Sequence, residues 1–550
     1  MKKITITFPD NSSIQVENEI RPVTLMNHFA DNGQKILACR VNNEVCPLDS
    51  LIDINASIEP VYENTKEGAA IYRRSLCFLL AVAAHNLFPD ARLLVGHSLD
   101  YGYYYTLDRE EAIGREQIEA LKKEMQRLVD ADKVIECEVI SYQDACAAFE
   151  KLGLIETRKQ LNYHTPARIK INSLDGFADM YFGPLVSSTK ALDVFDLMPY
   201  QEGFLLRFPK HENPDTLPEF KDQPKLFEIY KRYKAWGKRL NVTSAAGLNQ
   251  LISERKVNDF IDITETLQVK CIADIADQIQ KKKTVRVVLI AGPSSSGKTT
   301  TSKKLALQLR AIGYKPHVIS LDSYYLGREE TPKDENGDYD YECLEALDVK
   351  QINEDLLSLF DGKTINVPCY DFHEGKRYYK GETMTLGPND ILVMEGIHGL
   401  NDKLTPLIAP ELKFKIYLSA LTQLNLDDHN RIATSDNRLI RRIVRDAQFR
   451  GKSAAGTIAM WDSVQKGERL HIFPFQNNAD AMLNTALDYE LSVLRVYAAP
   501  LLRCVTPMEK EYSEARRLLA FLENFCTIPA TAVPNQSIIR EFIGGSAFHY

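Results

Sequence analysis

The stretch AGPSSSGKTT, residues 291–300, constrains the fold of this chain more than any other. An almost unbroken apolar run, TVRVVLIAG, leads into it, and a helical pattern, KTTTSKKLALQLRAIG, follows. A strand that is apolar throughout is buried on both faces, which is typical of parallel sheets covered by helices. The spacing G-x-x-x-x-G-K-[ST] between such a strand and such a helix predicts a phosphate-binding loop.

The loop indicates that ATP is bound together with Mg²⁺. Glycines and small serines let backbone N–H groups turn inward around phosphate oxygens, and the helix N-terminus adds partial positive charge. We expect Lys298 to reach the outer phosphates and Thr299 to offer its hydroxyl to Mg²⁺. The residues expected to bind the nucleotide are Gly292, Pro293, Ser294, Ser295, Ser296, Gly297, Lys298, Thr299 and Thr300.

Two further apolar runs end in a carboxylate. DILVMEGIHG (390–399) reaches Glu395, and KPHVISLDSYY (315–325) reaches Asp322. Functional groups gather at the carboxyl ends of parallel strands, so we expect Glu395 to join Thr299 at the metal. Asp322 would orient an acceptor hydroxyl and take its proton. Two simpler interpretations stay open: Asp322 caps a turn, and Glu395 merely ends a strand.

Five stretches, in order along residues 284–500, resemble the uridine kinase and phosphoribulokinase family. They are LDSYY (321–325), DYECLEALD (340–348), VPCYDFHEGKR (367–377), MEGIHG (394–399) and RLIRRIVRDAQFRG (438–451). The resemblance implies that Asp322 is the catalytic base and that Glu342 binds ribose hydroxyls. It implies that Tyr370 and Phe372 pack on the base.

The arginine-rich stretch corresponds to the lid of this family, and the resemblance assigns Arg442, Arg445 and Arg450 to it. Fixed guanidinium groups stabilise the charge that builds up during phosphoryl transfer. On a helix Arg438, Arg442 and Arg445 share one face; a solvated basic face is the alternative. The expected catalytic residues are Lys298, Asp322, Arg445 and Arg450. The expected acceptor-binding residues are Asp322, Tyr325, Glu342, Tyr370, Phe372, Arg377 and Arg442.

Two positions depart from the family. Gly375 stands where uridine-specific members have a histidine, and Lys452 replaces the last lid arginine. Both departures bear on the choice of acceptor more than on phosphate transfer.

The first 190 residues resemble a different family, the threonyl-tRNA synthetases. ILACRVNNEVCPLDSLIDINASIEPV resembles their TGS module, and residues 72–107 and 175–197 resemble their editing domain. That domain uses H-x-x-x-H and C-x-x-x-H pairs, which can share a metal or a substrate. The four matching positions here are Arg74, Phe78, Tyr181 and Leu185. The resemblance therefore implies that the fold is kept and the editing chemistry lost.

These observations predict an α/β protein with a doubly wound parallel sheet of the P-loop kinase type. The expected domains are a TGS-like β-grasp domain (1–62), an editing-like α+β domain (65–240), a helical connector (247–283), the kinase domain (284–500) and a tail (501–550).

Composition limits the partners. The net charge is −8, and residues 1–62 carry eight acidic against five basic side chains, which argues against nucleic acid as a partner. No apolar run approaches the ~18–20 residues that span a bilayer. Ten cysteines stand singly, as expected for reduced thiols in the cytoplasm. Whether the chain forms a homo-oligomer stays open.

We expect an ATP- and Mg²⁺-dependent kinase that phosphorylates the 5′-hydroxyl of a nucleoside, uridine or cytidine in the first place. A kinase for another small alcohol is one alternative. An RNA-binding or nucleotide-sensing regulator is another.

Overall fold

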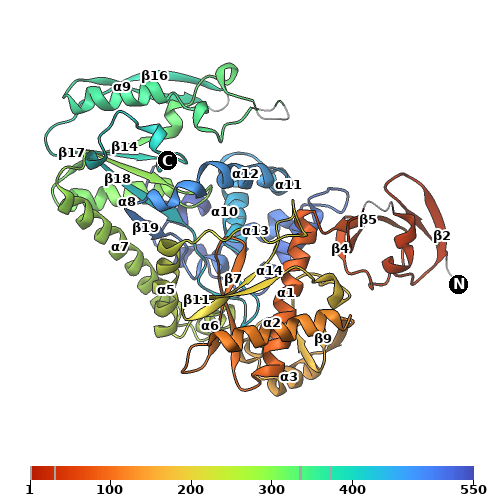
Figure 1. Cartoon of the computed structure of the whole chain (residues 1–550). Coiled ribbons are helices and arrows are strands. Elements are labelled where there is room, and N and C mark those ends of the chain that lie inside the picture. Colours follow the sequence, from red (N-terminus) through yellow and green to blue (C-terminus); the bar gives the residue numbers. More distant parts are fainter. Residues whose placement is uncertain (1–2, 30–32, 334–336, 338, 372–373, 550) are drawn as a thin grey trace. The chain divides into compact units, whose positions relative to one another are not determined.

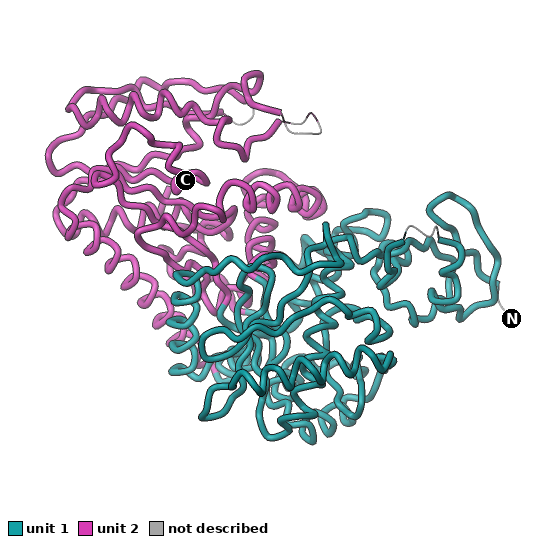
Figure 2. The backbone as a smooth tube through the Cα atoms, viewed as in Figure 1, with its two compact units in different colours: residues 1–254, 423–433, 499–527 teal, residues 255–422, 434–498, 528–550 magenta. Residues whose placement is uncertain are grey.

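The computed structural model describes residues 3–29, 33–333, 337, 339–371 and 374–549. The chain divides into two compact units, coloured separately in Figure 2. The first consists of Met1–Glu254, Gln423–Ala433 and Ala499–Thr527, and the second of Arg255–Thr422, Thr434–Ala498 and Ile528–Tyr550. Each unit is therefore assembled from three separate stretches of chain. The domain boundaries expected from the sequence remain predictions.

The first unit begins with a five-stranded mixed sheet of order β2-β1-β5-β3-β4. The alternation in β1 buries Ile4 and Ile6 on one face and leaves the intervening side chains partly exposed, as period-two patterning requires. β1 and β5 run parallel, and the other neighbours are antiparallel. Its strands are β1 (Lys3–Thr7), β2 (Ser13–Glu17), β3 (Ile36–Val41), β4 (Glu44–Cys46) and β5 (Ala56–Tyr62).

The rest of the first unit is built around one buried helix, α1 (Lys66–Leu87) (Figure 1). Thr65 caps its N-terminus by accepting the N–H of Gly68 at 3.0 Å. Residues 75–84 are buried on every side, as expected for a helix inside a core. Two antiparallel sheets complete the unit: β6 (Arg92–Ser98), β7 (Gly102–Asp108), β12 (Gly203–Arg207) and β11 (Asp196–Tyr200), and β8 (Glu136–Ser141), β9 (Arg168–Leu174) and β10 (Phe177–Asp179).

Further helices of this unit are α2 (Arg115–Asp130), α3 (Tyr142–Lys151), α4 (Ile155–Gln160), α5 (Pro224–Arg239), α6 (Ala245–Ser253) and α14 (Tyr512–Leu522). Residues 423–433 are fixed in the unit by β6. The N–H of Val95 donates to the carbonyl of Asp428 at 2.9 Å, and Nη2 of Arg92 lies 2.6 Å from Oδ1 of Asp428. Asn425 donates in turn to the carbonyl of Val95 at 2.7 Å.

The second unit contains a five-stranded sheet of order β14-β17-β13-β18-β19, in which all neighbouring strands are parallel. Every residue of β13 (Val287–Ala291), the strand of this sheet that comes first along the chain, is buried. This confirms the parallel α/β fold expected from its apolar run. The other strands are β14 (Lys315–Ser320), β17 (Asp390–Glu395), β18 (Lys413–Ser419) and β19 (Ala481–Asn484).

Along the chain, helices and one hairpin precede, connect and follow the strands of this sheet. The hairpin pairs β15 (Ile365–Asp371) with β16 (Lys376–Met384). The helices are α7 (Val257–Lys282), α8 (Lys298–Ala311), α9 (Val349–Phe360), α10 (Thr434–Phe449), α11 (Ala454–Ala459), α12 (Trp461–His471), α13 (Glu490–Arg503) and α15 (Arg540–Ile543).

All ten cysteines are free thiols. Across the described ranges, no helix is both long enough and apolar enough to cross a membrane.

Candidate active site

The phosphate-binding loop connects β13 to α8 in the second unit. Gly297 has a φ of +79°, and a β-carbon there would come within 2.6 Å of Cγ2 of Ile538. Only glycine fits such a left-handed and crowded position. Nζ of Lys298 donates to the carbonyl oxygens of Gly292 at 3.0 Å and Pro293 at 3.2 Å. The ammonium group thus lies over the loop, where phosphate oxygens would meet it.

Thr299 and Glu395 form the pair expected at the metal. Strand β17 lies beside β13, with Glu395 opposite Ile290, and Oγ1 of Thr299 donates to Oε1 of Glu395 at 3.1 Å. Burial raises the pKa of Glu395 to about 7; repulsion from Asp322 adds to this, and Lys298 opposes it. A hydroxyl and one carboxylate beside a phosphate site suit Mg²⁺, which keeps several waters and takes few protein ligands.

Asp322 lies at the same edge of the sheet. In the sheet, β14 pairs with β17 on the side away from β13, and Ser320 of β14 lies opposite Glu395. Asp322 follows two residues after Ser320. Burial raises the pKa of Asp322, and the positive charges of Lys298, Arg450 and Arg445 oppose that rise. The carboxylate is therefore close enough to the loop lysine to respond to its charge.

The turn after β14 has its own cap. The hydroxyl of Ser320 accepts the N–H of Asp322 at 3.3 Å. Ser320 therefore serves the capping role that the sequence left open for Asp322. Among the described residues, the Asp322 carboxylate accepts no hydrogen bond that would tie it to the turn, so it is available to a hydroxyl group.

The arginines of α10 fall into two groups. Nη1 of Arg442 donates to Oγ of Ser294 in the loop at 2.6 Å. Arg438 and Arg441 are instead buried structural residues: Arg438 forms a double hydrogen bond with Glu468, and Arg441 binds Glu490 with Nη2–Oε2 2.6 Å. A simple solvated basic face is excluded, because the arginines of α10 are mostly buried, and only Arg450, just after the helix, is more than half exposed (58%).

One carboxylate, Asp446, pairs with the lid arginines, a role that no pattern in the sequence indicates. Its Oδ1 lies 3.0 Å from Nη2 of Arg445 and 3.7 Å from Nη1 of Arg450. Its Oδ2 lies 3.3 Å from Nε of Arg442. The Asp446 side chain is only 2% exposed. It therefore fixes three guanidinium groups next to the loop.

A second carboxylate absent from the predictions, Glu468 of α12, binds the loop directly. Its Oε1 accepts the N–H of Ser294 at 2.9 Å while both oxygens pair with Arg438. Nη1 of Arg438 also donates to the carbonyl of Ser294 at 3.1 Å. A buried carboxylate and its arginine partner thus clamp the backbone of the loop from both sides of one residue.

Glu342, expected to bind the acceptor, lies against α12. The N–H of Glu342 donates to Oδ1 of Asp340 at 3.0 Å. A β-carbon on Gly467 of α12 would come within 2.7 Å of Cβ of Glu342. Burial and the charge of Glu468 raise the pKa of Glu342 to about 7, against the pull of Arg442 and Lys298. At neutral pH this side chain can donate or accept a hydrogen bond.

Two of the expected aromatic side chains meet. The rings of Tyr325 and Tyr370 are 5.6 Å apart and inclined by 56°, and the hydroxyl of Tyr325 donates to the carbonyl of Tyr341 at 3.1 Å. Phe372 lies outside the described residues. The negative charge of Asp322 contributes to the raised pKa of Tyr325, so this pair of rings lies near Asp322.

Arg377 and Gly375 sit on the hairpin that follows. Nη1 of Arg377 pairs with Oδ2 of Asp348 at 2.9 Å, and Asp348 also caps α9, so this arginine has a structural partner. Gly375 has a φ of +68°, and a β-carbon there would approach Nε of Arg328 to 2.8 Å. The histidine of uridine-specific members could not be accommodated at this position without a shift of Arg328.

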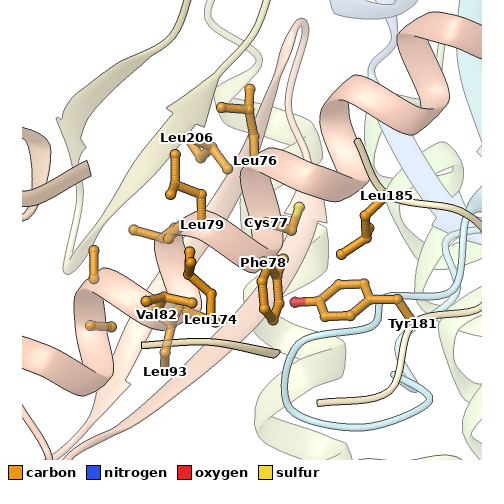
Figure 3. Close-up of a cluster of buried hydrophobic side chains, with 14 of the residues drawn as sticks. Leu76, Cys77, Phe78, Leu79, Val82, Leu93, Leu174, Tyr181, Leu185 and Leu206 are labelled. Carbon is orange, nitrogen blue, oxygen red and sulfur yellow. The ribbon is translucent and has the colours of Figure 1, made fainter. Parts of the chain in front are cut away.

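In the first unit, three of the positions that would carry editing chemistry lie in the hydrophobic core (Figure 3). The rings of Phe78 and Tyr181 pack edge to face at 5.6 Å, and Leu185 is 2% exposed. Arg74 donates to the carbonyl of Pro184 at 2.9 Å, and its guanidinium fills the space where a β-carbon on Gly183 would lie. Packed side chains therefore occupy the positions of the histidines and the cysteine.

Comparison with known proteins assigns the two regions separately. Residues 287–492 match the model of the Phosphoribulokinase / Uridine kinase family. The C-terminal region is thus related to this kinase family. The N-terminal part is similar to threonine–tRNA ligase: the enzyme of Burkholderia lata is 33% identical over 205 residues, which are 36% of this chain and 31% of the ligase. The ligase of Burkholderia mallei is also 33% identical, over 201 residues. The chain therefore spans about a third of the length of these curated relatives.

Solved structures similar to the chain include a possible uridine kinase from Bacillus stearothermophilus, with 20% identity and a TM-score of 0.27, covering 39% of this chain and 98% of that one. Another is D-glycerate 3-kinase from Cryptococcus neoformans, with 14% identity and a TM-score of 0.21, covering 46% and 87%. Likeness at this level does not assign a substrate. Both resemblances noted in the sequence are confirmed by the family model and the ligases.

Proposed function

We propose that this protein transfers the terminal phosphate of ATP to the 5′-hydroxyl of a nucleoside, with uridine or cytidine as the first candidates. The observation that carries the proposal is the meeting of Asp322, Lys298 and Glu395 at the carboxyl ends of neighbouring parallel strands. A proton acceptor, a phosphate ligand and a metal ligand then surround one reacting hydroxyl.

Asp322 is the proposed general base. The acceptor hydroxyl donates its hydrogen bond to the carboxylate; the proton moves to Asp322 as the oxygen bonds to the terminal phosphorus of ATP, and the bond from that phosphorus to ADP breaks so that ADP leaves. Burial raises the pKa of Asp322, which makes the carboxylate a better proton acceptor, and the positive charges of Lys298, Arg450 and Arg445 limit that rise.

The cationic residues stabilise the transferred charge. Lys298 and the three arginines held by Asp446 provide fixed positive groups for the oxygens shared between donor and acceptor, and fixed groups need no reorganisation during the reaction. Thr299 and Glu395 would hold Mg²⁺, which neutralises phosphate charge when bound.

A nucleoside suits the acceptor side. The inclined rings of Tyr325 and Tyr370 offer apolar surface to a flat base, and Glu342 can form hydrogen bonds with vicinal hydroxyls of a ribose. Because Gly375 lacks a side chain that could reach the base edge, we expect discrimination among nucleosides to be weaker than in enzymes with a histidine there.

A panel of nucleosides and sugars, assayed for ATP-dependent phosphate transfer with and without Mg²⁺, tests the proposal. We expect transfer to a pyrimidine nucleoside that disappears without Mg²⁺. Transfer only to a sugar would replace the nucleoside with another alcohol. A panel without any product, from protein that still binds ATP, would favour a nucleotide-sensing regulator.

A further inference from the structure

The C-terminal segment Ile528–Tyr550 belongs to the second unit and is firmly packed. Ile538, Ile539 and Phe542 are fully buried. The guanidinium of Arg540 donates to the carbonyls of Ala530 at 2.8 Å and Gly544 at 3.2 Å, and so closes the segment on itself. The short helix α15 is therefore presented in one orientation.

This segment touches the phosphate-binding loop at two points. Ile538 fills the space in front of Gly297. Oε2 of Glu541 accepts hydrogen bonds from the backbone N–H of Thr300 at 3.1 Å and from its hydroxyl at 2.6 Å. A carboxylate oxygen from the tail thus lies at the first turn of α8.

The N–H of Thr300 belongs to the first turn of α8, before the helix's own series of bonds to carbonyls four residues earlier begins. Thr300 is the third residue of α8, and the first bond from an N–H to a carbonyl four residues earlier is made by Thr301 to Gly297, at 3.0 Å. Free N–H groups in the first turn of such a helix are the groups that bind the phosphates of nucleotides. Glu541 therefore occupies a place suited to a phosphate oxygen.

The charge of Glu541 also reaches the metal-binding pair, because it contributes to the raised pKa of Glu395. A carboxylate at this point repels an incoming phosphate. It also occupies two hydrogen-bond donors of Thr300, the N–H and the hydroxyl, that the phosphate could otherwise use. Glu541 is the only acidic residue between positions 528 and 550. The effect is therefore attributable to one side chain.

We propose that Glu541 is an internal competitor of the nucleotide: it binds Thr300 in the free protein, and a phosphate group of bound ATP replaces it. The proposal rests on the proposed function only in requiring that the loop bind ATP. While Glu541 occupies the site, a molecule cannot bind ATP there. The apparent dissociation constant of ATP is therefore the intrinsic constant divided by the fraction of molecules whose site is open.

Displacement of Glu541 would also affect α10, because neighbouring tail residues contact that helix. The ring of Phe542 lies 5.1 Å from the guanidinium carbon of Arg441, and the carbonyl of Ile543 accepts Nε2 of Gln448 at 3.1 Å. Both partners belong to α10. The tail thus connects the state of the loop to the helix that carries Arg442 and Arg445.

The first test compares the dissociation constants of ATP for wild type, Glu541→Gln and a control, Glu354→Gln, by isothermal titration calorimetry. Glutamine keeps an acceptor for Thr300 and removes the charge. Glu354 lies on α9, half exposed and paired only with Lys350 at 3.8 Å in the part of the chain described. We expect Glu541→Gln to bind ATP about tenfold more tightly, which corresponds to a tail docked in about nine molecules of ten, and the control to match wild type.

Unchanged or weaker binding by Glu541→Gln would overturn the proposal while leaving the kinase function intact. Absence of ATP binding by wild type would overturn both. A measurement on wild type avoids any folding defect of the variant: hydrogen–deuterium exchange of a peptide spanning 537–545, with and without ATP. We expect several-fold faster exchange with ATP; equal or slower exchange contradicts displacement.

Discussion

Oδ1 of Asp446 lies 3.0 Å from Nη2 of Arg445, the residue immediately before it on α10. The same carboxylate reaches Arg442 and Arg450 and is almost inaccessible to solvent. In the proposed reaction Asp446 acts by fixing the arginines that stabilise the transferred charge.

Replacing Asp446 by asparagine should therefore lower kcat more than it changes binding. One acceptor oxygen is lost, the arginines gain freedom, and misplacement of such groups costs about 10- to 100-fold in rate. Steady-state kinetics should show the loss in kcat with KM for ATP changed far less, and Asp446→Glu should recover part of it. Asp361→Asn, at a 65% exposed residue of the same unit, is the control. An equal loss in the control, or none in Asp446→Asn, contradicts the role.

Asp322→Asn tests the general base. The substitution keeps size and hydrogen bonding but cannot accept a proton, so turnover should fall by at least about 100-fold. Calorimetry should show that ATP still binds, because Lys298 and the loop are untouched. Normal turnover would remove Asp322 from the mechanism.

Glu395 makes the stability of the protein depend on pH. Its pKa is raised to about 7 in the folded protein from 4.5, so folding favours the protonated form. This contribution is fully present below about pH 4.5 and is lost as the pH rises through 7. We expect Glu395→Gln to raise the unfolding temperature at pH 8, and to change it little at pH 5, where the wild-type residue is mostly protonated. The gain is at most about 3 kcal/mol.

Thermal unfolding of wild type, Glu395→Gln and Glu354→Gln across pH 5–8 measures this effect. The Glu354 variant should follow the wild-type curve. The stability gain of Glu395→Gln over wild type should be larger at pH 8 than at pH 5. An equal gain at both pH values would mean that burying an ionised Glu395 does not destabilise the protein.

The core position Phe78 should behave as a packing residue. It is fully buried against Tyr181, and removal of such a ring typically costs about 3–5 kcal/mol. Phe78→Ala should lower the denaturant midpoint of the first unit, whereas Val139→Ala, at a 53% exposed position, should leave it within experimental error. An unchanged midpoint in Phe78→Ala would contradict the packing role of this ring.

The sequence was sufficient for the parts of the site that follow from regular structure. Once β13, β14 and β17 are identified as parallel strands, the rule that their carboxyl ends meet brings Lys298, Asp322 and Glu395 together. The same reasoning could not find Asp446 or Glu468, because an acid inside an arginine-rich helix or on α12 has many ordinary roles. Their partners emerge only from the tertiary packing.

Two other features had no local signal. SIIREFIGG contains no catalytic motif, yet Glu541 and Thr300 are 241 positions apart and hydrogen-bonded. The stretch 423–433 reads as a polar loop after β18, and nothing in its residues indicates that it completes the unit built by the N-terminal region. Long-range contacts of this kind leave no periodicity or spacing to detect.

The placement of residues 423–433 decides how the protein can be dissected. Cutting the chain after residue 254 would deprive Arg92 of the carboxylate of Asp428 and Val95 of its backbone partner, and would expose the edge of β6. A fragment that starts at residue 284 would contain residues 423–433 without the first-unit residues that they contact. Neither unit can therefore be isolated by simple truncation, so the contribution of each unit has to be measured by point substitution within the intact polypeptide.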